Sequence, residues 1–153
     1  MKKNINIYVD TSVYGGVFDE EFSNPSKRFF EQVKNGDFLV ITSALVREEM
    51  SYAPEKVRIL FEEMQKYSVI ADITEDSLKL RESYINANIV TSKYSNDALH
   101  VAIASSSNCS IILSWNFKHI VHYEKIALYN AINLINGYQQ IFIYSPNEVI
   151  KYD

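Results

Sequence analysis

The chain has 153 residues, of which 47% are hydrophobic and 22% charged, with only 4 Gly and 3 Pro. This composition excludes a disordered or fibrous chain and suits one globular domain spanning residues 1–153. The formal net charge of -4 argues against broad nucleic-acid binding through a basic surface. No apolar run reaches the length of a membrane span, and the single cysteine, Cys109, forms no internal disulfide. We therefore expect a cytoplasmic protein without membrane partners.

The elements predicted from the sequence alternate between strands and helices. The run from Ile5 to Val9 is β-branched and aromatic, which predicts a buried strand that ends at Asp10. Thr11 and Ser12 then resemble the start of a helix. In the first half of the chain we predict a turn-rich segment over 13–24, a helix over 25–34, a strand over 38–41, a helix over 44–50, a helix that begins at Pro54 and includes Met64, and an extended segment over 68–73. In the second half we predict a capped helix over 74–86, a helix over 97–107, a strand over 111–114 and a helical region beginning at 115–117. The last predicted elements are an amphipathic helix over 127–135, a strand over 141–144 and a helical turn after Pro146. This alternation predicts the α/β class, with a mostly parallel sheet covered on both faces.

Three acidic positions coincide with one predicted edge of the sheet. Asp10 ends the first strand, Glu48 and Glu49 lie on the helix after the second strand, and Asp97 begins the helix before the third. Carboxyl ends of parallel strands meet at one edge, so these side chains are expected to gather there. Each acid alone also has a structural explanation, as a turn former, a solvated helix face or a helix-start acid. Together they predict a site for Mg²⁺ or Mn²⁺, which prefer carboxylate oxygens.

Four short motifs occur in order along nearly the whole chain. They are Ile7–Ser12, Thr42–Met50, Asn96–Ala104 and Leu113–Phe117. In this order and on these predicted elements, they resemble the PIN-domain family of metal-dependent ribonucleases. The resemblance implies a three-layer α/β/α sandwich, an acidic pocket for Mg²⁺ or Mn²⁺, and cleavage of single-stranded RNA by water. Many members are toxins of toxin–antitoxin pairs and form dimers, which implies an antitoxin protein partner and a homodimer here.

The resemblance also assigns site residues. It implies that Asp10 and Asp97 hold the metal ion and that Asp10, Glu49, Asp97 and Asn116 form the catalytic set, with Thr11, Ser12 and Glu48 in support. Glu48 stays an alternative to Glu49 at the second acidic position.

Asn116 departs from the family pattern, because members often carry an Asp at that place. An amide oxygen can accept a hydrogen bond from metal-bound water but brings no charge, so metal affinity should be lower. The alternative interpretation is therefore a weakened module that binds RNA or a protein partner without cleaving. A phosphatase with Asp10 as nucleophile is disfavoured, since Ser12 stands where such enzymes carry a second acid.

Several residues outside the acidic set are further candidates for contacts with RNA or for packing. Lys118, His119 and His122 cluster after Asn116, and helical spacing predicts an RNA phosphate-contacting face, with a plain solvated face as the equal alternative. His100, one helical turn after Asp97, is predicted to pack or hydrogen bond and not to bind metal. Tyr14 is a candidate for stacking on a base.

Overall fold

The computed structural model describes residues 5–152, in which five strands form one sheet in the order β3-β2-β1-β4-β5. All four pairings between neighbouring strands are parallel. The strands are β1 (Ile5–Val9), β2 (Phe38–Ser43), β3 (Ser68–Ala71), β4 (Ile111–Leu113) and β5 (Phe142–Tyr144). The chain adds β2 and β3 on one side of β1 and then returns to add β4 and β5 on the other.

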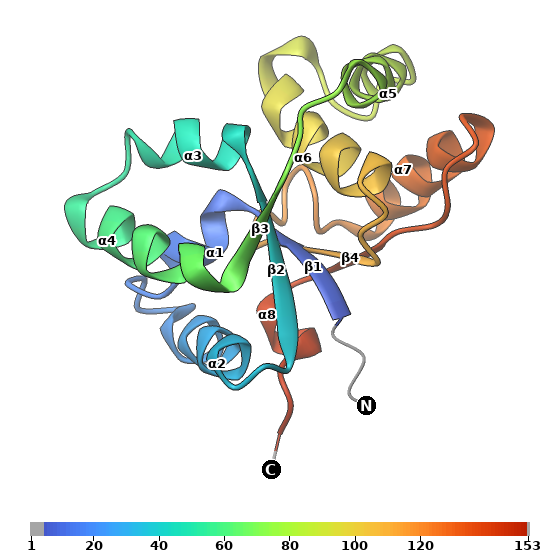
Figure 1. The fold of residues 1–153 in the computed structure, drawn as a ribbon. Helices are drawn as coiled ribbons and strands as arrows, with labels where there is room; N and C mark the ends of the chain where they lie inside the picture. The colour runs from blue at the N-terminus through green and yellow to red at the C-terminus, as the bar shows by residue number, and fades with distance from the viewer. Residues whose placement is uncertain (1–4, 153) are drawn as a thin grey trace.

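Helices cover both faces of this sheet (Figure 1). They are α1 (Thr11–Gly16), α2 (Ser23–Lys34), α3 (Ala44–Met50), α4 (Glu55–Met64), α5 (Glu75–Asn86), α6 (Ser95–Ser106), α7 (Tyr123–Ile135) and α8 (Pro146–Val149), with short 3-10 turns η1 (Gln65–Tyr67) and η2 (Ser92–Tyr94). In Figure 1, α1, α2 and α4 lie on one side of the sheet, and α5, α6 and α7 lie on the other. The α/β class and the three-layer α/β/α arrangement predicted from the sequence are confirmed.

The central strand β1 is enclosed by both helical layers. Its residues Ile7, Tyr8 and Val9 have no solvent-exposed surface, although adjacent side chains of a strand point to opposite faces. This explains why the strand is a continuous apolar run in the sequence and does not alternate between apolar and polar residues. Residues 5–9 therefore form the buried strand that the sequence predicted, and Asp10 directly follows it.

A buried polar cluster joins the three helices of one layer. The Tyr84 hydroxyl on α5 donates to the Oδ1 atom of Asn133 on α7. The Nδ2 atom of Asn133 donates in turn to Ser105 on α6, over 2.9 Å. Asn133 has no exposed surface, so both polar ends of its amide are satisfied inside the protein. These directional bonds fix how the three helices pack against one another.

Two predicted segments differ from the structure. The segment over 13–24 was expected to be turn-rich, but α1 continues to Gly16 and α2 begins at Ser23. Glycine at position 16 is a packing requirement, because a Cβ atom there would lie 2.7 Å from both Ser26 Oγ and Trp115 Nε1. The helical region predicted from Trp115 is instead a turn, and α7 begins only at Tyr123.

Two simpler expectations concern Cys109 and membrane spans. Cys109 is buried with a free thiol, and burial raises its pKa to about 12, so the thiol stays protonated at neutral pH. None of the helices within residues 5–152 combines the length and the apolar character needed to cross a bilayer.

Candidate active site at the carboxyl edge of the sheet

Asp10 is held at the junction of the two central strands. Its backbone nitrogen donates to the carbonyl oxygen of Leu113 on β4, over 3.0 Å, which extends the β1–β4 pairing by one residue. Its side chain caps α1, with Oδ1 accepting from the backbone nitrogen of Ser12 over 2.5 Å. Only 4% of Asp10 is exposed, so the carboxylate is nearly enclosed at the edge of the sheet.

Ser114 connects Asp10 to the segment after β4. Its hydroxyl donates to the Oδ2 atom of Asp10 and lies 3.5 Å from the Ser12 hydroxyl. The same Ser114 oxygen accepts from the backbone nitrogen of Asn116 over 2.9 Å, while Ser12 Oγ accepts from that of Trp115 over 2.9 Å. The two serines therefore fix the position of Asn116 relative to Asp10.

Glu49 reaches the site from α3. Ser43 ends β2 and caps α3, so this helix begins at the sheet edge where Asp10 lies. The Oε1 atom of Glu49 accepts from Thr11 Oγ1 over 2.6 Å and lies 2.6 Å from His100 Nε2. Glu48, the alternative second acid, is exposed. The structure thus brings Glu49, and not Glu48, against Thr11 of α1.

His100 is a buried link between the strands and the acids. Its Nδ1 atom lies 2.8 Å from the hydroxyl of Tyr8, which is itself 2.8 Å from Ser43 Oγ. Burial alone would lower the pKa of His100, but the hydrogen bond to Glu49 and nearby negative charges raise it above its ordinary value of 6.5. A raised pKa favours the protonated form of the ring, in which both nitrogens donate. This geometry agrees with the hydrogen-bonding role expected for His100.

The other two acids also affect the pKa of His100. The negative charges that raise its pKa include those of Asp10 and Asp97 as well as that of Glu49. Burial raises the pKa of Glu49, yet its hydrogen bonds to His100 and Thr11 bring that pKa below the ordinary value of 4.5. Glu49 is therefore ionised at neutral pH.

Asp97 has the opposite shift. Burial raises the pKa of Asp97 above its ordinary value, and the negative charge of Asp10 adds to the rise. Nearby His119 and His100 and a hydrogen bond with Asn116 act against that rise without cancelling it. The repulsion between Asp10 and Asp97 is the condition that a divalent cation relieves.

The segment after Asn116 is a turn, so the helical face predicted for its basic residues does not form. The Oδ1 atom of Asn116 accepts from the backbone nitrogen of His119 over 3.0 Å, and its carbonyl oxygen accepts from that of Val121 over 2.8 Å. Lys118 is exposed. His122 caps α7 by accepting from the backbone nitrogen of Glu124 over 3.3 Å. Of the three predicted RNA contacts, His119 is the one hydrogen bonded to Asn116.

Tyr14 does not face the site. Its ring is fully buried, 5.0 Å from the ring of Phe30 and 5.3 Å from that of Phe61 between ring centres. The prediction that Tyr14 stacks on a base is therefore wrong, because the side chain belongs to the core between α1, α2 and α4.

Two residues of this site were not assigned to it from the sequence. Ser114 follows β4 in the same way that Asp10 follows β1, so its position at the strand end was a usable signal. His100 lies three residues after Asp97 on α6, a spacing that puts two side chains on one helix face. Its contact with Glu49 depends on how α6 packs near α3, which no local pattern encodes.

The strand order, the two helical layers and the acidic strand edge define a class of α/β sandwich with a carboxylate site at the point where strand order reverses. A family model of the PIN domain matches residues 7–121. The chain therefore belongs to the PIN-domain family, which confirms the resemblance stated from its motifs.

Solved structures give the same fold. VapBC2 from Rickettsia felis, bound to a DNA fragment from its promoter, matches with a TM-score of 0.58 and 13% identity over 92% of this chain and 98% of that chain. FitAB bound to an IR36 DNA fragment matches with a TM-score of 0.55 and 11% identity over 96% and 99%. Identities this low bear on the fold alone. No curated protein sequence matches the chain.

Proposed function

We propose that the protein is a metal-dependent endoribonuclease that cleaves single-stranded RNA by water attack on the phosphodiester. The observation that carries this proposal is the hydrogen bonding of Glu49 to Thr11, the residue after Asp10, and to His100, which lies three residues after Asp97 on α6. These contacts support a shared acidic site at this sheet edge, of the kind that hydrolysis assisted by a hard cation uses.

The donor set fits Mg²⁺ or Mn²⁺ in part. Within residues 5–152, no group of three or more His, Cys, Asp or Glu side chains is spaced to hold a metal ion alone. Mg²⁺ is usually held by one or two carboxylates, with waters and substrate phosphate completing its shell. Asp10 and Asp97 would be those carboxylates, and their mutual repulsion supports the assignment. The ion would supply charge for the developing phosphorane-like oxygens and lower the pKa of a water molecule.

Glu49 is suited to orient the attacking water. Both of its hydrogen bonds, from Thr11 and His100, go to Oε1, which leaves Oε2 to accept from water. The side chain is 29% exposed, so solvent reaches it. Its lowered pKa keeps it ionised at neutral pH. Thr11 and His100 would thus act as positioning residues for this carboxylate.

The experiment that tests the proposal is cleavage of labelled single-stranded RNA with Mn²⁺ or Mg²⁺ and with EDTA. We expect Asp10→Asn and Asp97→Asn to lower the rate by about a hundredfold or more, since a lost metal ligand removes several kcal/mol of charge stabilisation. Asp76→Asn, in the first turn of α5, is the matched control. Cleavage that persists in EDTA, or in both site variants, would refute the assignment.

The pair Glu49→Gln and Glu48→Gln separates the two candidates for the second acidic position. The substitutions are chemically the same, and the residues are adjacent on α3. We expect Glu49→Gln to reduce cleavage strongly and Glu48→Gln, at an exposed position, to leave it near wild type. The reverse result would move the catalytic role to Glu48.

We further propose that the protein is the toxin of a toxin–antitoxin pair and forms a homodimer in the cytoplasm. Support comes from the family and from the two similar structures, which are described as VapBC2 and FitAB complexes. The test is growth arrest on expression, relieved by co-expression of a small open reading frame beside the gene, together with the mass of the purified protein in solution. Normal growth with full nuclease activity would contradict the toxin role alone.

A second candidate is a non-catalytic module that binds RNA or a protein partner. The observation in its favour is Asn116, which brings no charge and whose Oδ1 atom already accepts from His119. Titration calorimetry with Mn²⁺ distinguishes the two candidates. Heat that disappears in Asp10→Asn supports the nuclease, whereas no heat at millimolar Mn²⁺ supports the binding module.

A further inference from the structure

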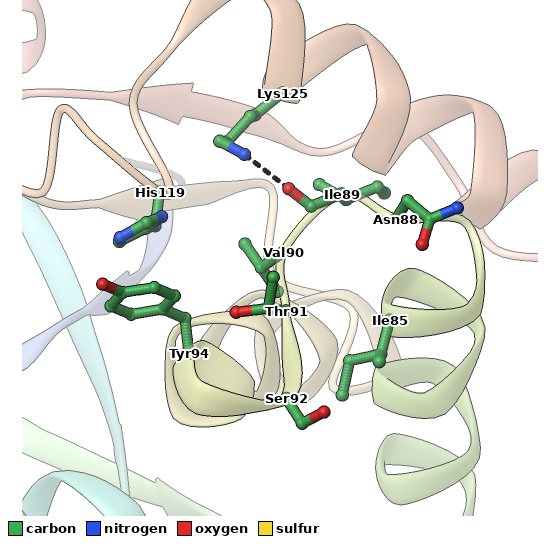
Figure 2. A pocket seen from close by; sticks show the side chains of 9 residues that line it. All are labelled: Ile85, Asn88, Ile89, Val90, Thr91, Ser92, Tyr94, His119 and Lys125. Atoms are coloured by element: carbon green, nitrogen blue, oxygen red, sulfur yellow. Dashed lines mark hydrogen bonds between the residues drawn. The ribbon is translucent and has the colours of Figure 1, made fainter.

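A pocket of about 480 Å³ lies beside the acidic edge, between the α5–α6 connection and the start of α7. Figure 2 shows the side chains around it. Ile85, Ile89 and Val90 form an apolar wall, and Asn88, Thr91 and Ser92 supply polar groups. Tyr94, His119 and Lys125 complete the lining. Pockets of a few hundred Å³ with an apolar wall and a few polar groups are typical of small-ligand sites.

One end of the pocket is aromatic. The rings of Tyr94 and His119 stack with their centres 3.9 Å apart and an angle of 29° between planes. In Figure 2 these two rings lie together at one side of the pocket. Stacked aromatic rings offer a flat surface for a nucleobase, whose binding depends on the π-face and tolerates different bases.

His119 also has hydrogen-bonding capacity that the protein does not use. Both of its ring nitrogens are shielded from solvent and have no hydrogen-bond partner within the described residues. Burial lowers the pKa of His119, and the positive charges of Lys125 and Lys118 lower it further, although Asp97 acts in the other direction. A neutral imidazole offers one donor and one acceptor, the combination that the edge of a base also presents.

Lys125 supplies a cation to the lining of the pocket. Its Nζ atom donates to the carbonyl oxygen of Ile89, which holds the side chain at the edge of the pocket (Figure 2). An ammonium group has three donors, so two remain for the phosphate oxygens of a nucleotide.

The pocket is physically joined to the acidic site. The backbone nitrogen of His119 donates to Asn116 Oδ1 over 3.0 Å, and its carbonyl oxygen accepts from the Tyr129 hydroxyl over 2.9 Å. These two bonds fix the backbone of His119 relative to Asn116. Asn116 is also a side-chain hydrogen-bond partner of Asp97, which connects this segment to that carboxylate. A base held at Tyr94 would therefore position the adjoining phosphodiester near Asp10 and Asp97.

We propose that this pocket binds one unpaired base of single-stranded RNA and selects where the chain is cut. The selection of the cleavage position rests on the proposed function, whereas base binding itself requires neither a metal ion nor cleavage. Tyr94 and His119 contact the base, and Lys125 contacts a phosphate next to it.

The first test uses the wild-type protein and measures binding in EDTA, where no cutting occurs. A labelled six-nucleotide RNA is compared by fluorescence anisotropy with six versions, each lacking the base at one position. We expect one position at which the missing base weakens binding about tenfold, the cost of losing one stacked base. Equal affinity for all six versions, or no binding of the intact RNA, would overturn the proposal.

The second test uses Tyr94→Leu, which removes the flat ring and keeps an apolar side chain. We expect its affinity for the intact RNA to fall about tenfold and its preference among the abasic versions to disappear. Tyr52→Leu, at a residue that is 87% exposed and does not line the pocket, is the matched control. Lys125→Met should also weaken binding and reduce its salt dependence, whereas Lys34→Met on α2 should do neither.

Failure of this proposal and failure of the nuclease assignment give different results. A position-dependent abasic effect without metal-dependent cleavage supports the pocket and refutes the nuclease. Metal-dependent cleavage with identical cut sites in wild type and Tyr94→Leu supports the nuclease and overturns the pocket. If Tyr94→Leu leaves RNA binding intact and weakens binding of an antitoxin peptide, the pocket is a protein-docking site and the proposal is wrong.

Discussion

The Nε2 atom of His100 lies 2.6 Å from the Oε1 atom of Glu49, and this pairing raises the pKa of the ring and lowers that of the carboxyl group. Only 3% of the His100 side chain is exposed, against 29% for Glu49. A protonated ring at this depth is stable only with an ionised partner, so the ionisation of Glu49 and the stability of the core around Tyr8 depend on each other.

The first prediction concerns the pH dependence of stability. His100 has a raised pKa, so its contribution is present below 6.5 and is lost as the pH rises through the folded-state value. Glu49 has a lowered pKa, so its contribution is present above 4.5 and is lost as the pH falls through the folded-state value. The pair therefore stabilises the fold most between pH 4.5 and 6.5.

Urea unfolding of wild type and Glu49→Gln across pH checks this prediction. We expect the free energy of unfolding to differ by about 1 kcal/mol in that window, at the low end for a charged hydrogen bond because solvent screens the partly exposed carboxylate. The difference should shrink at both higher and lower pH. A difference that does not change with pH would contradict the ion pair.

The second prediction concerns Ser114. Replacement by Ala removes the donor to Asp10 Oδ2 and the acceptor of the Asn116 backbone nitrogen. We expect a loss of about 1–3 kcal/mol in unfolding free energy, because buried polar groups are left unpaired. Metal affinity, measured by calorimetry, should also fall. Ser51→Ala on an exposed turn is the control, and equal metal affinity in both variants would show that Ser114 does not position Asp10.

The third prediction compares two adjacent glycines. Gly16→Ala brings a methyl group against Trp115 and Ser26, so we expect a loss of about 1–3 kcal/mol and a shift in the fluorescence of the single tryptophan. Gly15→Ala meets nothing within 4 Å and should be neutral or stabilising by up to about 1 kcal/mol. Thermal unfolding and emission spectra measure both effects. Equal behaviour of the two variants would contradict the packing described for Gly16.

The fourth prediction concerns Asn116→Asp, which adds a carboxylate at the place where family members often have one. The new oxygen can still accept from the backbone nitrogen of His119. We expect tighter Mn²⁺ binding by calorimetry, because site affinity rises with ligand charge. We also expect lower stability in EDTA, because the added charge repels Asp97. Unchanged affinity would show that residue 116 is outside the metal site.

The sequence predicted the sheet and the position of its acids well, for a simple physical reason. Strands enclosed on both faces are short apolar runs, as in Ile7–Val9, and a polar residue that ends such a run lies at the sheet edge. Asp10 could therefore be placed without any knowledge of tertiary contacts. The choice between Glu48 and Glu49 could not, because adjacent helix residues differ only in direction and the packing of α3 decides which one faces Thr11.

The turn after Asn116 and the burial of Tyr14 show where local patterns fail. The spacing of Lys118, His119 and His122 is compatible with a helix, but Asn116 accepts from the His119 backbone and closes a turn instead. Tyr14 is close to Asp10 along the chain, yet its helix turns the ring toward Phe30 and Phe61. The position of Tyr14 depends on contacts with residues distant in sequence, whereas the turn is closed by a local hydrogen bond that helical spacing alone does not predict.

The pairing of β1 with β4 has a consequence for synthesis of the chain. Asp10 emerges early, but Asp97 follows only after β2, β3 and α5 have been made, and Ser114 only after α6 and β4 as well. A ribosome-bound fragment that ends before β4 has the first carboxylate without the residues that enclose it. Translation therefore delays assembly of the acidic centre until most of the polypeptide has been synthesised.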